Sequence, residues 1–458
     1  ILFEPLEHQM IIQKLYSENE TEVLYGLELL KNIDTQILVT LLHNKSVRVR
    51  LRVLEIMKTG HNHLFLADVK RCLKTERDTK VLASLIDVYG YLGEIDANDD
   101  LQRFLQNDEN DIQDAAIASL MKYGGIDGIL IAGKHMNELF DHHTASQKIR
   151  GLHLLRTIGI AGGYRLLREA MHSDVVALKL VAIETIGSLK IYRLLDDVYD
   201  LLDDPLYRMV AVKSLIKFGD EIRDHVIDAF LKSVSTERKS LLIKILAYMK
   251  NHRTNEFLIT YINDYTLFLP LVESLSMANY LTKEKEVIEK LLQQNILNMR
   301  EEEHLSQGFD PKKYPNSMVI FAEQKKKRVH GIFLILGLFY PKYLIFQAKA
   351  NFFSESNDKK AFAIELLDNL LDKTFKQHVI GVLEDHKKSE PFICDNESCM
   401  SRVLIEDKYP LILKMSLIYE VGMSKDIRFQ GLISSLRSSD NSLVRETAIW
   451  SYTKLREG

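Results

Sequence analysis

The chain has 458 residues, which is enough for two or three ordinary domains or for one long repeat array. Hydrophobic residues make up 46% of the chain and charged residues 27%, so a large core and a solvated surface are available and bulk disorder is excluded. The formal net charge of −4 lacks the basic excess of a sequence-independent nucleic-acid binder, so we expect no nucleic-acid partner.

A self-similar segment recurs in the N-terminal half of the chain. Each copy begins with a polar turn, continues as a long amphipathic stretch and ends in glycine. Successive copies end at Gly90, Gly124, Gly159, Gly187 and Gly219. The mean step, (219 − 90)/4, is about 32 residues, within the range of helical repeats. Apolar residues recur at three- and four-residue spacing, and no sustained period-two alternation appears. The sequence therefore predicts an all-α fold.

The glycines and small residues of these copies have predicted structural roles. We expect each closing glycine to adopt the left-handed conformation that ends a helix. Between the copies lie shorter amphipathic stretches, such as Tyr164–Met171, which we interpret as the partner helix of each hairpin. Leu178, Val181, Ala182 and Ile186 share one face of a predicted helix and should form part of the core between helices.

The pattern resembles HEAT repeats, whose second helix carries a Val-Arg pair after a polar turn. Val47-Arg48 and Val444-Arg445 match this signature best. The resemblance implies an α-α superhelix, a HEAT-like α-solenoid of stacked helical hairpins. We expect a repeat array over residues 1–300, a polar insert or loop over 301–317, and C-terminal repeats that continue the solenoid over 318–458.

Cations recur in consecutive second helices of the predicted array. Arg150, Lys179, Arg208 and Lys213 are the candidates for a contact face, because equivalent positions of stacked repeats line up. Such a face would suit a protein segment or a neighbouring domain of the same polypeptide. Ordinary surface charge is the alternative interpretation.

Other polar clusters resemble known sites without completing them. Gly128–Lys134 fits the first seven positions of a phosphate-binding loop, but His135 stands where a Ser or Thr is needed and the intervening residues favour a helix. Cys394 and Cys399 lack the second cysteine pair of a zinc site, so we interpret them as part of a loop. The histidine clusters are expected to lie in solvated turns; they comprise His61, His63, His135, His142 and His143. We predict no catalytic residue, metal or cofactor.

The basic run Lys325, Lys326, Lys327 and Arg328 has two interpretations. It is either a solvated helix face or a surface that meets anionic lipid headgroups. The apolar stretch Ile332–Tyr340 that follows is too short to span a bilayer, so we expect no transmembrane segment. Three cysteines, an odd number, favour a reducing, cytoplasmic compartment. Because the first residue is Ile1, we expect the chain to belong to a longer polypeptide.

Residues 325–458 carry a narrower resemblance. The segments Gly337–Pro341, Ala363–Leu371, Tyr409–Tyr419 and Leu443–Trp450 occur in the same order in the HEAT region of bacterial ATP/ADP translocase-like proteins. In that family the region follows a membrane nucleotide-carrier domain. The resemblance implies that this chain is the soluble part of such a protein, at the inner face of the membrane. The substrate-binding residues of the carrier have no counterpart here, so none is transferred.

These observations favour a non-catalytic regulatory or scaffolding module attached to a nucleotide carrier. A free-standing protein-binding scaffold is the alternative. A HEAT-fold enzyme, of the DNA glycosylase or bilin lyase type, is a remote third possibility. A glycosylase should present a basic concave face with aromatic residues, whereas this chain has one Trp and a net negative charge.

Overall fold

The computed structural model describes residues 5–30, 33–60, 63–159, 163–264, 266–282, 285–384 and 396–457. Every regular element in these ranges is a helix, so the predicted all-α fold is confirmed. The chain forms two compact units, unit 1 (Ile1–Phe218) and unit 2 (Gly219–Gly458).

Unit 1 is a succession of helical hairpins. Its α-helices are α1 (Pro5–Lys14), α2 (Glu20–Leu29), α3 (Thr35–Leu41), α4 (Val47–Thr59), α5 (Leu66–Cys72), α6 (Thr79–Gly93), α7 (Asn98–Gln102), α8 (Asn110–Tyr123), α9 (Gly125–Asp141), α10 (Ala145–Ile158), α11 (Tyr164–Met171), α12 (Val176–Leu189), α13 (Leu195–Asp200) and α14 (Arg208–Phe218). Short 3-10 helices join some of them: η1 (His63–Phe65), η2 (Glu94–Ala97), η3 (Arg103–Gln106), η5 (Tyr192–Leu194) and η6 (Leu201–Asp203).

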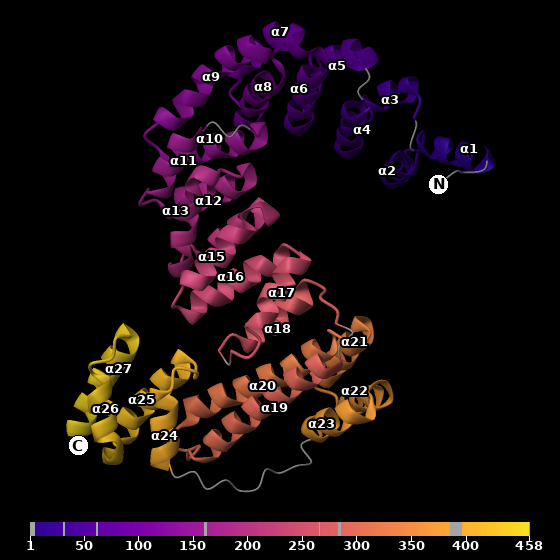
Figure 1. Ribbon diagram of the computed structural model, residues 1–458. Coiled ribbons are helices and arrows are strands. Elements are labelled where there is room, and N and C mark those ends of the chain that lie inside the picture. Colours follow the sequence, from indigo (N-terminus) through magenta and orange to yellow (C-terminus); the bar gives the residue numbers. More distant parts are fainter. Residues whose placement is uncertain are drawn as a thin grey trace. The chain divides into compact units, whose positions relative to one another are not determined.

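The second helices of these hairpins stack in series. Contacts between successive second helices run through α4, α6, α8, α10, α12 and α14. Within unit 1 these helices line the inner side of an arc (Figure 1). The outer side of the arc carries α5, α7, α9, α11 and α13. This stacking of hairpins is the HEAT-like arrangement that the repeat predicts.

Polar turns and small residues specify the repeat locally. Asp78 caps α6 by accepting hydrogen bonds from the backbone N–H groups of Lys80 and Val81, both at 3.0 Å. In α12, the predicted core residues Leu178, Ala182 and Ile186 are buried, which confirms the assigned face. Val181, at the edge of the same face, is half-buried.

The repeat glycines have two different roles, and only one of them was predicted. Gly159 (φ 80°) and Gly219 (φ 75°) adopt the left-handed conformation expected after a helix. Gly124 follows α8 with φ −78°. Gly90 and Gly187 instead lie buried inside α6 and α12.

The buried glycines face serines of the next second helix. A Cβ atom on Gly187 would lie 2.5 Å from Ser214 Oγ and 2.6 Å from its Cα, and one on Gly90 would lie 1.9 Å from Ser119 Oγ. In unit 2 the same contact joins Gly422 of α25 to Ser451 of α27, where a Cβ would lie 2.9 Å from the serine Cα. These glycines therefore permit close approach of consecutive second helices rather than ending a helix.

Unit 2 contains longer and less regular helices. They are α15 (Arg223–Lys232), α16 (Thr236–Tyr248), α17 (His252–Thr260), α18 (Phe268–Met277), α19 (Lys285–Gln307), α20 (Pro315–Leu336), α21 (Lys342–Phe352), α22 (Asn357–Leu370), α23 (Lys373–Leu383), α24 (Asn396–Ile405), α25 (Leu411–Ser424), α26 (Gln430–Leu436) and α27 (Ser442–Arg456), with 3-10 helices η7 (Gly219–Ile222) and η8 (Ile427–Phe429).

The stack of second helices in unit 2 skips part of the chain. α16 contacts α18, α18 contacts α20, α20 contacts α25 and α25 contacts α27. The intervening α21, α22 and α23 form a branch that packs on the long α19–α20 hairpin through α20–α21 and α19–α23 contacts (Figure 1). The chain between 318 and 458 therefore does not simply repeat the pattern of unit 1.

Most of the segment 301–317, which the sequence led us to expect as a loop, is helical. Residues up to Gln307 belong to α19, and Pro315 begins α20, so only residues 308–314 connect the two helices. The charged residues at 301–303, which suggested solvent, instead pair with cations of neighbouring helices. The apolar stretch beginning at Ile332 ends α20 and is core: Ile332, Phe333 and Ile335 are each 0% exposed.

Within the described ranges, no helix is both long enough and apolar enough to cross a membrane.

Candidate functional site

The four predicted contact cations lie on second helices of unit 1, but they do not form one free ladder. Arg150, on α10, donates from Nε to Asp114 Oδ1 and from Nη2 to Gln113 Oε1, both at 2.6 Å. Its side chain is only 14% exposed. Arg150 thus joins α10 to α8.

The other three cations differ in exposure. The Lys179 ammonium lies 4.4 Å from the centroid of the Tyr207 ring, a cation–π contact. Arg208 is half-buried at the start of α14, and Lys213, one and a half turns further along, is exposed. Of the four, Lys213 is the cation most open to a partner.

Arginine pairs between successive repeats recur nearer the N-terminus. Arg50 of α4 pairs with Glu76, before α6, at 3.0 Å, with side chains 12% and 13% exposed. Arg48 pairs with Glu20 at 2.7 Å, on the surface. Arg48, one of the two arginines that gave the HEAT resemblance, therefore ties neighbouring repeats together, whereas Arg445 donates to the Ser439 carbonyl just before its own helix at 2.8 Å.

A lysine and two tyrosines form a cluster at the C-terminal ends of α4, α6 and α8. Lys58 Nζ lies 2.5 Å from Asp87 Oδ2 and 5.7 and 5.5 Å from the ring centroids of Tyr91 and Tyr123. Burial alone would lower the pKa of Lys58, but the hydrogen bond and charge of Asp87 raise it. Because the ammonium, the carboxylate and the rings of this cluster contact one another, few of their polar atoms are open to a ligand.

The basic run at 325–328 faces the acidic run at 301–303 across the α19–α20 hairpin. Arg328 Nη2 donates to Glu302 Oε1 at 2.8 Å, and the two side chains are 5% and 8% exposed. Lys325 pairs with Glu303 at 3.0 Å. Only Lys326 and Lys327 of the run are exposed. A solvated helix face therefore describes Lys326 and Lys327, whereas Arg328 is buried and Lys325 is paired with the preceding helix.

Glu301 joins the same hairpin to a later part of unit 2. It pairs with Arg402 of α24, with Lys408 at 2.8 Å and with the Tyr409 hydroxyl at 3.2 Å. Glu420 of α25, 3% exposed, accepts from the backbone N–H groups of Asn316 and Ser317 at 2.6 and 3.2 Å. It therefore caps the N-terminus of α20.

Three other lysines of unit 2 are not neutralised in this way. Together with the residues around them they form what we call the lysine surface, which comprises Lys244 (α16), Glu273 (α18), Lys327 and His330 (α20), and Phe346 and Lys349 (α21). Glu273 is exposed, and the charges of Lys244, Lys327 and Lys349 act to lower the pKa of its carboxyl group. In the described chain, none of these three lysines has a carboxylate within ion-pairing distance.

Aromatic rings flank these lysines. Lys349 lies 5.5 Å from the centroid of the Phe346 ring, which is 37% exposed, and 3.4 Å from His330 Nε2. Burial lowers the pKa of Lys349, and burial together with Lys349 lowers that of His330. Lys342 donates to the Ser276 carbonyl and to Asn279 Oδ1, both at 2.7 Å, and so fixes the start of α21 against the end of α18.

Sequence reasoning missed the lysine surface because it assembles from four helices. One signal was present: Lys342, Phe346 and Lys349 are four and three residues apart, and so share one helix face.

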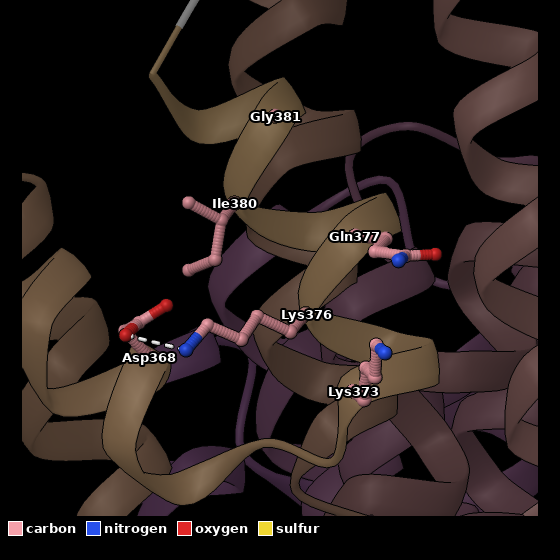
Figure 2. A pocket seen from close by; sticks show the side chains of 6 residues that line it. All are labelled: Asp368, Lys373, Lys376, Gln377, Ile380 and Gly381. Atoms are coloured by element: carbon pink, nitrogen blue, oxygen red, sulfur yellow. Dashed lines mark ion pairs between the residues drawn. The ribbon is translucent and has the colours of Figure 1, made fainter.

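A cavity of about 480 Å³ lies between α22 and α23 (Figure 2). Lys376 Nζ pairs with Asp368 at 2.6 Å within it, and the remainder of the lining is formed by Lys373, Gln377, Ile380 and Gly381. A Cβ on Gly381 would meet nothing within 4 Å. The lining contains no histidine, cysteine or hydroxyl nucleophile, so it supplies no catalytic group.

The sites that only resembled known motifs take ordinary structural places. Gly128–Lys134 lies inside α9, as the helical interpretation predicts. His63 Nδ1 contacts the Leu92 carbonyl oxygen at 2.9 Å, and His61 lies outside the described residues. Over the described ranges, no group of three or more His, Cys, Asp or Glu side chains is arranged to hold a metal.

The expected loop at the C-terminal cysteines is partly helical. Cys399 is buried in α24, whereas Cys394 lies outside the described residues.

Stacked helical hairpins make this chain an all-α, HEAT-like repeat protein. No protein-family model matches it, and no curated protein matches its sequence.

Solved structures with a similar arrangement include the karyopherin Kap121p, 12% identical over 100% of this chain with a TM-score of 0.35. Yeast importin-beta (Kap95p) is 10% identical over 98% of this chain, also with a TM-score of 0.35. The chain spans 58% of the length of Kap121p and 74% of that of Kap95p.

Proposed function

We propose that this chain is a non-catalytic binding module that holds a protein segment against its stacked second helices. The supporting observation is the continuous series from α4 to α14 in unit 1, in which each second helix contacts the next. Such a series offers one long surface, built from elements that each contact only their neighbours.

The chemistry of the described residues favours binding over catalysis. Catalysis needs convergent acids, bases or nucleophiles in a recess. The cavity between α22 and α23 holds an ion pair instead, and the histidines of the earlier motifs are distributed over separate turns and helices.

Within this proposal, the contact face includes Lys213 and Lys179. Lys213 is exposed, and Lys179 keeps a partly exposed ammonium over Tyr207. Arg150 and Arg208 are half-buried, so they support the neighbouring helices more than they meet a partner.

A photo-crosslinking amino acid at position 213, in the full-length protein, tests this face. We expect a specific crosslink to a protein segment, identified by mass spectrometry, which Lys179→Glu weakens. The matched control places the same amino acid at Arg165, exposed on the outer helix α11. Equal labelling from positions 213 and 165 would contradict the proposal.

We further propose that this module belongs to an ATP/ADP translocase-like membrane protein, on its cytoplasmic side. The support is the ordered likeness of four segments, which occupy the α20–α21 connection, α22, the start of α25 and α27. Lys326, which is exposed, would then be the part of the basic run that faces anionic lipid.

The reading frame upstream of Ile1 tests this association directly. We expect it to encode a hydrophobic carrier domain. A start codon shortly before Ile1 would instead favour the free-standing scaffold, and a hydrolytic or transferase turnover by the purified chain would contradict both.

A further inference from the structure

We propose that the lysine surface of unit 2 binds an acidic protein segment that carries aromatic or other large apolar side chains. This inference rests on the proposed binding function and names the chemistry of one partner.

The charge balance of the lysine surface is the first argument. Lys244, Lys327 and Lys349 come from α16, α20 and α21, and all three lie near one carboxylate, that of Glu273. Three cations around one anion leave a local excess of positive charge, in a chain whose net charge is −4. A segment with two or more carboxylates would balance this excess.

The hydration of these lysines is the second argument. Burial lowers the pKa of Lys349 more than the nearby charge of Glu273 raises it, so its ammonium is partly desolvated and forms no ion pair within the described residues. The ammonium of Lys342 is also partly buried, but it replaces lost water by donating hydrogen bonds to the Ser276 carbonyl and the Asn279 amide oxygen. A ligand carboxylate beside Lys349 would form a charge-assisted hydrogen bond in a place where water is already reduced.

The exposed aromatic rings of α21 and of the residue that follows it are the third argument. Phe346 is 37% exposed and Phe353 43%. His330 and Phe353 have ring centroids 6.3 Å apart, so aromatic surface continues from the lysines. Large apolar side chains on the ligand would cover these rings.

A peptide fits this arrangement better than a membrane does. Lipid headgroups meet exposed basic residues such as Lys326, whose side chain is 67% exposed. Here the cations are spread over three helices, and two of them, Lys244 and Lys349, are half-buried. An extended chain can reach such positions one side chain at a time.

Fluorescence anisotropy with the full chain tests the proposal. The probe is a fluorescein-labelled peptide of six glutamates and two phenylalanines, and its counterpart carries glutamine at every glutamate. We expect the Lys327→Glu/Lys349→Gln variant to bind the acidic probe about tenfold more weakly than wild type, because it removes two attractions and adds one repulsion. Binding should weaken as salt rises.

The matched control is Lys290→Glu/Lys312→Gln, which changes net charge equally at two exposed lysines of α19 and the α19–α20 connection. It should bind like wild type. If the first variant loses its helical circular dichroism, Lys327→Glu alone, at an exposed position, should still weaken binding about threefold.

Three results would overturn the proposal: equal binding by variant and control, equal binding of the glutamine probe, or binding only to phosphatidylserine vesicles. Each is independent of crosslinking at position 213. If the variant and its control bind the peptide equally but position 213 still gives the specific crosslink, only the lysine surface is rejected. If peptide binding depends on the lysines but position 213 gives no specific crosslink, only the proposed contact face of unit 1 is rejected.

Discussion

Unit 1 and the α19–α20 hairpin of unit 2 are held together by different means. In unit 1 the contacts link near neighbours in sequence: Ser214 Oγ donates to the Ile183 carbonyl across 31 residues, next to Gly187. In unit 2 the α19–α20 hairpin depends on buried charges and on partners about one hundred residues away. Glu420 reaches Asn316 across 104 residues, and Arg402 reaches Glu301 across 101.

The difference shows how a repeat array accommodates irregular helices. In unit 1 small residues allow close packing of second helices that are between 11 and 15 residues long. Where α19 and α20 exceed the usual length and α21–α23 branch away, polar side chains fix the geometry instead. Replacing these polar residues of unit 2 should therefore cost more stability than replacing the surface ion pairs of unit 1.

The largest effect should come from breaking the Arg328–Glu302 pair. Arg328→Met leaves the Glu302 carboxylate buried without its guanidinium, which should cost about 3–5 kcal/mol of the free energy of unfolding. Thermal and urea unfolding would measure it. The double variant Arg328→Met/Glu302→Leu should recover most of the loss, because no buried charge remains. A double variant as unstable as the single one would show that the charges themselves do not set the cost.

A smaller effect is expected at the glycine–serine contact of unit 1. Gly187→Ala places a Cβ 2.6 Å from Ser214 Cα, so the helices must separate, at about 1–3 kcal/mol. Gly133→Ala in α9 is the control, because its Cβ would meet nothing within 4 Å. It should stabilise by up to about 1 kcal/mol. Equal melting temperatures for the two variants would reject the close-approach role.

Acid should lower the stability of each unit by protonating a carboxylate that accepts hydrogen bonds in the folded state. Hydrogen bonds from Lys70 and Tyr89 hold the pKa of Asp100 below 3.8 in unit 1, and a hydrogen bond from Arg428 does the same for Asp426 in unit 2. Because these folded-state pKa values are lowered, the stabilisation is present above about pH 4 and is lost as pH falls through them. Each should contribute less than about 1 kcal/mol. Melting curves of Asp100→Asn and Asp426→Asn from pH 7 to 3 should be flatter than wild type; unchanged slopes would contradict the assignment.

The smallest effect is expected within the same basic run as Arg328. Lys326 pairs with Glu323 on the surface, with side chains 67% and 55% exposed. Lys326→Ala should therefore change stability by less than about 0.5 kcal/mol. A loss comparable to that of Arg328→Met would mean that burial does not decide which residues of the run contribute to stability.

The sequence was sufficient to predict the helical class, the hairpin repeat and the α12 core. It did not separate Gly159, which ends a helix, from Gly187, which packs inside one, because both follow an isoleucine at the end of an amphipathic stretch. The deciding contact, with Ser214, lies on another helix.

The charged segments were harder to interpret for a similar reason. Glu301–Glu303 suggested solvent because composition records charge but not its partner. Each of the three glutamates meets a cation from another helix. The lysine surface was equally invisible, since its members lie on four helices from Lys244 to Lys349.

The cap that Glu420 provides for α20 has a consequence for the order of folding. Repeats of unit 1 can complete their contacts soon after each hairpin is synthesised, because their partners are about 30 residues away. The first turn of α20 must wait for α25, 104 residues later. At the usual speed of translation this is a delay of about 5–20 s. During that interval the start of α20 has its backbone donors open to water, so the nascent chain should gain protease resistance in unit 1 first and at the α19–α20 hairpin last.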